Sequence, residues 1–167
     1  MENKSMSTKK KLAILAGIIA TIFIGVNLAW FIGVWMPYNK YTENMELDTN
    51  TSNSRSYVYE DKTYIYRLNR PSYLFFNAGF FSVEKTGAEL MIFIYPESFE
   101  KGYTYRLDSM NTDTGDSMCF FIDSDLKVLS YNEENPEFND SYKQFLNENY
   151  VEISLMLNSA IDFWGLE

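Results

Sequence analysis

Histidine is absent from this 167-residue chain, and cysteine occurs only once, at Cys119. Without histidine the commonest general base is missing, which excludes Ser–His–Asp and Cys–His catalytic sites. A zinc site built from histidine and paired cysteines is excluded for the same reason. A single cysteine cannot form an internal disulfide, so a folded domain depends on its apolar core. The apolar run Ser117–Ile122 around Cys119 predicts a buried thiol.

Nucleotide-binding and nucleophile motifs are also missing, since no P-loop, Gly-x-Gly-x-x-Gly or Gly-x-Ser-x-Gly pattern occurs. The acidic loop Asn111–Asp116 lacks the ligand spacing of an EF-hand, because Gly115 stands fifth and Ile122 twelfth. A pair of carboxylates acting as in glycosidases stays open as an alternative. We therefore expect no enzymatic activity, no cofactor and no bound metal. The carboxylates considered for the alternative are Asp108, Asp123, Asp125, Glu133 and Glu134.

Charge is absent from residues 12–36, a run of apolar and small residues. As a helix this run extends about 37 Å, more than the ~30 Å hydrocarbon core of a membrane. The run exceeds the apolar region of a cleaved signal peptide, about 7–15 residues, and no Ala-x-Ala-like site follows it. The sequence therefore predicts an uncleaved transmembrane signal-anchor helix.

The flanking charges predict the orientation of this helix. Four lysines precede it, and Lys40 is the only nearby base after it, so the N-terminus is expected in the cytoplasm. Residues 37–167 contain 10 Lys and Arg against 22 Asp and Glu, a net charge of −12, which argues against a nucleic-acid partner and against docking on anionic lipid. Low cysteine with abundant Asn, Lys, Tyr and Ile suggests a bacterial cell-surface protein. The predicted parts are a cytoplasmic tail (1–11), the membrane helix (12–36), a polar stalk (37–55) and an extracytoplasmic domain (56–167).

Small residues recur at every fourth position of the membrane segment, from Ala13 to Gly33. This spacing lets two membrane helices approach closely, and a nearby asparagine can donate a hydrogen bond across the pair. The alternative is that small residues are simply common in membrane helices. The predicted helix-packing interface comprises Gly17, Thr21, Gly25, Asn27, Ala29 and Gly33.

Beyond the stalk, short aromatic and β-branched runs separated by turn residues predict about eight strands. Their consecutive hairpins favour an antiparallel meander. Residues 64–85 resemble residues 103–123, as either a duplicated unit or a chance recurrence. The expected strands are 56–60, 63–68, 72–77, 80–85, 89–95, 103–110, 117–122 and 127–131.

Apolar residues at helical spacing predict one long helix over residues 141–164, with Gly165 as its stop. The fold class is thus α+β: an N-terminal transmembrane helix, then an antiparallel meander sheet packed against one long C-terminal helix. The second half of that helix is apolar over more than one face, which predicts either a helix wrapped by the sheet or a face for a protein partner. The predicted partner face comprises Leu155, Ile161, Phe163 and Trp164.

Aromatic residues are abundant, with 13 Tyr, 13 Phe and 3 Trp. Most are expected in the core, and exposed tyrosines offer a surface on which sugars or peptides stack. The leading hypothesis is a single-pass membrane protein whose outer domain is a non-enzymatic binding or assembly module, self-associating or joined to a membrane complex. The alternative is a cell-wall or glycan-directed binder or a carboxylate-based hydrolase.

Overall fold

The computed structural model describes residues 7–49, 55–74, 79–87, 89–97, 102–110, 117–129 and 136–166, without the side chains of 136–139. Helix α1 (Thr8–Trp30) continues without interruption as a π-helical turn, η1 (Phe31–Trp35), and a 3₁₀ segment, η2 (Met36–Tyr41). Pro37 explains the change of pitch, because proline lacks an amide N–H and its ring crowds the carbonyl one turn earlier. The helix is long and apolar enough to cross a membrane, and its most apolar stretch is not buried by protein, as suits a membrane anchor or a signal sequence.

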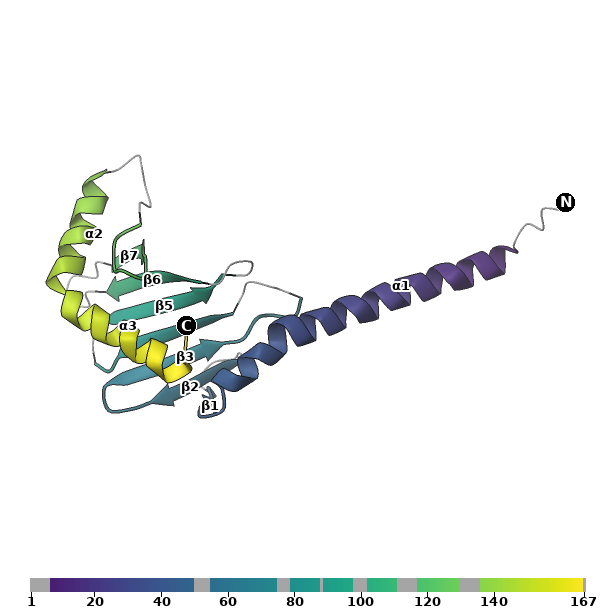
Figure 1. Cartoon of the computed structure of the whole chain (residues 1–167), viewed down its shortest axis with the longest axis horizontal. Helices are drawn as coiled ribbons and strands as arrows, with labels where there is room; N and C mark the ends of the chain where they lie inside the picture. Colours follow the sequence, from purple (N-terminus) through teal and green to yellow (C-terminus); the bar gives the residue numbers. More distant parts are fainter. Residues whose placement is uncertain are drawn as a thin grey trace.

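Seven strands form a single antiparallel sheet whose spatial order equals the order along the chain (Figure 1). This arrangement confirms the predicted meander, in which each strand pairs with the next through a short connection. The strands are β1 (Glu46–Leu47), β2 (Ser56–Glu60), β3 (Tyr64–Asn69), β4 (Phe80–Lys85), β5 (Leu90–Pro96), β6 (Tyr103–Met110) and β7 (Ser117–Ile122).

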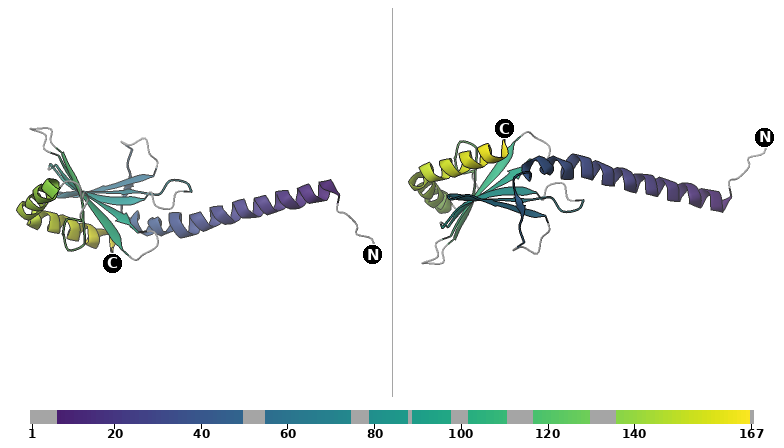
Figure 2. Two further views of the ribbon diagram at one scale, coloured as in Figure 1. Left: turned by 90° about the horizontal axis from the view of Figure 1, so that it is seen from above. Right: turned by 90° about the horizontal axis from the view of Figure 1, so that it is seen from below.

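Alternation of side chains divides the sheet into a covered face and an open face. Leu68 pairs with Phe81, and Ile92 pairs with Leu107, and all four are buried on the covered face. Helix α3 (Tyr150–Trp164) packs there through Ile153, Met156 and Ala160, among others, which are fully buried. Figure 2 shows the C-terminal helices on one side of the sheet. The predicted α+β architecture is therefore confirmed.

The C-terminal helical region contains a break that the sequence did not predict. Helix α2 (Pro136–Glu148) ends before Asn149, whose backbone is not helical (φ −109°, ψ 11°) and whose side chain donates to the Phe145 carbonyl. An asparagine that bonds to the backbone in this way competes with helical hydrogen bonds. Gly165 adopts the left-handed conformation (φ 61°) and ends α3, as predicted.

Two of the eight expected strands differ in the structure. Residues Tyr73 and Leu74, in the expected strand 72–77, form a turn, because Leu74 has a positive φ of 60°. In the expected strand 127–131, the described residues contribute only an isolated bridge between Val128 and Ile122. The short strand β1 was not anticipated and lies within the predicted stalk.

The two similar segments occupy equivalent hairpins. Tyr66 pairs with Val83 in the β3–β4 hairpin, and Tyr105 pairs with Ile122 in the β6–β7 hairpin. Both members of the second pair stand 39 positions after those of the first. The two hairpins therefore share one register, a condition that any duplicated unit has to meet.

Candidate functional site

The helical segment that leaves α1 ends inside the packing of the domain. The ring of Tyr38 stacks on Phe81 with centroids 5.9 Å apart, and Tyr41 meets the same ring edge-on at 5.0 Å. Phe81 is itself 1% exposed, at the centre of the core. Gly79 accommodates Tyr38, because a methyl group at Gly79 would collide with the Tyr38 hydroxyl. Both tyrosines thus lie against the core of the domain, although they fall within the range predicted as a stalk.

Arg70 makes a second set of contacts at this junction, where the helical extension of α1 (η1 and η2) meets the domain. Its guanidinium carbon lies 4.9 Å from the ring centroid of Trp35 and 4.8 Å from that of Tyr57. Its Nη2 donates to Thr42 Oγ1 at 2.8 Å, and the residue is only 8% exposed. This buried arginine therefore joins η1, β2 and the segment after η2. Its cation–π contacts are stronger than exposed ones because water is excluded from them.

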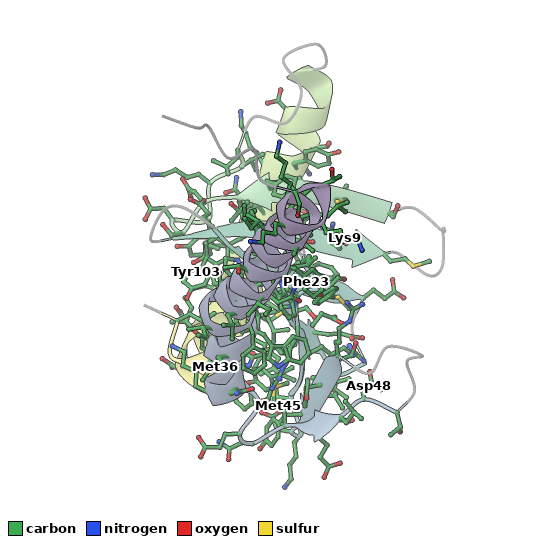
Figure 3. All side chains as sticks on the ribbon, turned by 90° about the vertical axis from the view of Figure 1, so that its right-hand side faces the viewer. Lys9, Phe23, Met36, Met45, Asp48 and Tyr103 are labelled. Carbon is green, nitrogen blue, oxygen red and sulfur yellow. The ribbon has the colours of Figure 1, made fainter. Side chains whose placement is uncertain are left out.

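A third contact lies further along α1, where the turn after β3 meets the helix. The Tyr73 hydroxyl donates to Asn27 Oδ1, and Asn27 Nδ2 donates to the Phe23 carbonyl at 2.7 Å. The Tyr73 ring meets Trp30 edge-on at 5.4 Å, and Trp30 is buried at 6% exposure. Figure 1 shows the described residues after β3 beside α1, and Figure 3 looks along α1 past Lys9 and Phe23 to Met36. Both polar ends of the Asn27 amide therefore bond within the chain.

The remaining residues of the predicted helix-packing interface are not covered by the rest of the described chain. Gly17, Gly25 and Gly33 have no neighbouring atom within 4 Å of the position a Cβ would take. Thr21 and Ala29 are exposed as well, and the Thr21 hydroxyl donates to the Gly17 carbonyl at 2.9 Å. These small residues are thus exposed along α1 and η1, whereas Asn27 contacts the domain.

The predicted partner face on α3 is divided between the core and the surface. Trp164 is 6% exposed and lies edge-on to Tyr66, and Phe163 stacks on the same ring at 4.3 Å. Ile161 is half-buried, whereas Leu155 is 58% exposed. Core packing accounts for most of the wide apolar character of this helix.

The described carboxylates that were considered for catalysis each have a local partner. Asp108 accepts two hydrogen bonds from Arg106, both at 2.9 Å, from Nε and Nη2. Asp123 accepts backbone N–H bonds from Asp125 and Lys127, as a turn-forming aspartate does. Asp125 pairs with the Lys127 ammonium at 3.1 Å. Glu133, Glu134 and the loop Asn111–Asp116 lie outside the described residues.

The open face of the sheet carries a band of aromatic side chains that the sequence analysis did not single out. The Arg106 guanidinium lies over Phe93 at 4.3 Å and near Tyr95 at 5.7 Å, and the two rings stack on each other. Phe80 packs against both rings. The signal was present in β5, where Ile92 and Ile94 alternate with Phe93 and Tyr95, so that both faces of one strand are apolar.

Cys119 lies on this open face and is exposed, so the prediction of a buried thiol is wrong. Successive side chains of a strand point to opposite faces of the sheet, so Cys119 faces away from the core because its neighbour Phe120 points into it. Cys119, Asp108 and Met91 line a pocket of about 520 Å³ on the sheet. Partial burial and, after it, the nearby Asp108 carboxylate raise the pKa of the thiol.

Three comparisons address the family of the chain, and none assigns it. No model of a known protein family matches, nor does any curated protein or any solved structure. Among the described residues no cluster of three or more acidic or cysteine side chains is arranged to hold a metal ion.

Proposed function

We propose that this chain is a single-pass protein of the bacterial cell membrane, with a cytoplasmic N-terminus and an extracytoplasmic, non-enzymatic binding or assembly module. The observation that carries the proposal is the junction. An apolar helix whose most apolar stretch is not covered by protein runs without a break into the core of a folded domain, where Tyr38 stacks on Phe81. A signal sequence that is removed has no need of such packing, whereas a permanent anchor is stabilised by it.

Cys119 provides a direct test of orientation, because it is the only cysteine and is exposed. A membrane-impermeant maleimide added to intact cells is expected to label the full-length protein. A Ser5→Cys variant in a Cys119→Ser background is expected to label only after the cells are permeabilised. The opposite pattern would place the domain in the cytoplasm and refute the proposed topology.

Self-association through α1 is the form of assembly that we favour. Successive residues of a helix are about 100° apart, so Asn27, which contacts the domain, lies about 160° around α1 from Gly25. By the same count Thr21 lies about 120° and Gly17 about 80° from Asn27, so Thr21 and Gly25 turn away from Tyr73, and Gly17 lies about 15 Å before Asn27 along the helix. Two helices can approach along this side, with small-xxx-small packing, without displacing the contacts of the domain.

The test of this assembly is the pair of substitutions Gly17→Leu and Gly25→Leu in the full-length protein. In this double variant, crosslinking in the native membrane is expected to yield no crosslinked homodimer. The matched control is Ile19→Leu with Phe23→Leu, which introduces the same residues on another side of the helix. Undiminished crosslinking of the double glycine variant would show that the stripe is not the interface. A constant heterologous partner in the crosslinked product would indicate an accessory subunit of a membrane complex instead.

A glycan-directed binder is the second candidate, supported by the aromatic band on the open face. Sugars stack on aromatic rings, and the adjacent rings of Phe93 and Tyr95 with Arg106 offer stacking surface and hydrogen-bond donors together. Binding of the full-length protein to a glycan array is expected to fall with Tyr95→Ala and to persist with Tyr150→Ala, on α3. A hydrolase would instead show turnover of wall glycans that Asp108→Asn abolishes.

A further inference from the structure

The contact between Tyr73 and Asn27 determines the depth at which one turn of the domain lies. Asn27 follows Lys11, the last charged residue before the apolar run, by 16 positions. At about 1.5 Å per residue, this separation is roughly 24 Å along α1, against a hydrocarbon core of ~30 Å. When α1 spans a bilayer with Lys11 near the inner boundary, Asn27 lies close to the outer boundary, on the hydrocarbon side. The Tyr73 hydroxyl, bonded to Asn27, has to lie at the same depth.

The side chains of this turn suit that depth. Tyr73 is 55% exposed and Leu74 is 38% exposed, and no charged residue occurs from Pro71 to Val83. Arg70, the charge immediately before the turn, is withdrawn between Trp35 and Tyr57. Tyrosine favours the boundary between water and hydrocarbon, and leucine favours the hydrocarbon itself. Exposure of the Leu74 side chain to water is unfavourable, and an apolar medium would remove that cost.

We infer that the turn after β3 inserts the side chains of Tyr73 and Leu74 into the outer interfacial layer of the bilayer and thereby seats the domain directly on the membrane. The partner is the lipid surface, and the attraction is apolar, because the acidic domain offers no attraction to anionic headgroups. The inference rests on the proposed function, since it requires α1 to span the membrane.

The test uses a fluorophore attached to single cysteines in full-length Cys119→Ser protein, reconstituted into phosphatidylcholine nanodiscs that contain doxyl-labelled lipid. A probe at Leu74→Cys is expected to be quenched several-fold more by lipid labelled near the headgroup than a probe at Val151→Cys. Val151 is the matched control, because it is 72% exposed on α3, away from the junction. Thermal unfolding of each labelled variant verifies that the domain is folded.

A third probe, at Ile24→Cys on α1, separates the two ways of failing. Quenching at Ile24 by lipid labelled deep in the acyl chain, with Leu74 no more quenched than Val151, would overturn the inference and leave the membrane anchor intact. An unquenched probe at Ile24 would refute the anchor and the inference together. A blue-shifted but unquenched probe at Leu74 would place the turn against protein instead of lipid, and would also overturn the inference.

Discussion

Replacing Tyr38 by alanine is expected to destabilise the folded domain, although the residue belongs to the helical extension of α1. In the structure the Tyr38 ring stacks on Phe81, contacts Tyr41 and packs closely against Gly79. Full truncation of a core aromatic costs about 3–5 kcal/mol. Tyr38 is half-buried, which reduces that figure, whereas its two aromatic contacts each contribute about 0.5–1.5 kcal/mol beyond buried area. We therefore expect the free energy of unfolding to fall by roughly 2–3 kcal/mol.

The assay is equilibrium unfolding of the full-length protein in detergent micelles by guanidinium chloride, followed by tryptophan fluorescence. The matched control is Tyr150→Ala, which truncates a tyrosine that is 49% exposed on the surface of α3. A second variant, Gly79→Ala, leaves Tyr38 in place but adds a methyl group that would collide with its hydroxyl and lie 2.9 Å from Pro71 Cδ. If Tyr38→Ala shifted the midpoint no more than Tyr150→Ala, residues 37–41 would be a stalk and the packing argument would be wrong.

Three further predictions concern the rest of the domain. Gly165→Ala is expected to lower the free energy of unfolding by about 1 kcal/mol, because Gly165 has a φ of 61° that disfavours a Cβ, and chemical denaturation checks this value. Partial burial and then Asp108 raise the pKa of the Cys119 thiol, so the rate of maleimide labelling is expected to keep rising at pH values above the ordinary thiol pKa. Asp108→Asn is expected to make labelling at pH 8 faster. An unchanged rate would contradict the role given to Asp108. Burial, followed by Tyr41, raises the pKa of Tyr103 from 10.0 to about 12. The stabilising contribution of this phenol is therefore fully present below pH 10 and is lost as pH rises through 12. In Tyr103→Phe, which carries no phenol, the free energy of unfolding should fall less with rising pH than in the wild type.

The sheet could be predicted from the sequence because its strands follow local rules. Tyr66 and Leu68 alternate with Arg67 and Asn69, and turn residues separate the strand-like runs, so pairing of consecutive strands was the simplest arrangement. Where prediction failed, a local feature opposed the pattern. Apolar residues continue beyond Pro71, yet the positive φ of Leu74 turns the chain, and Asn149 interrupts a run whose periodicity suggested one helix.

The junction could not be predicted, since it depends on contacts between distant parts of the chain. Tyr73 and Asn27 are 46 positions apart, and Arg70 reaches Thr42 across 28. Composition alone made residues 37–55 resemble a linker, because their polar residues outnumber the few aromatic ones that pack. The exposure of Cys119 was missed for a related reason, as it follows from the register that points Phe120 inward.

A flexible linker would let the domain swing and spin freely above the bilayer, whereas an uninterrupted helical rod does not. Hydrogen bonding continues from α1 through η1 and η2, and the end of the rod is held at Tyr38. Rotation of α1 about its own axis is consequently expected to rotate the sheet with it. If two copies pair along Gly17, Thr21 and Gly25 as proposed, their open sheet faces would be held at a fixed angle to each other. Pairing of the helices would then determine which surfaces of the two domains can bind a ligand together.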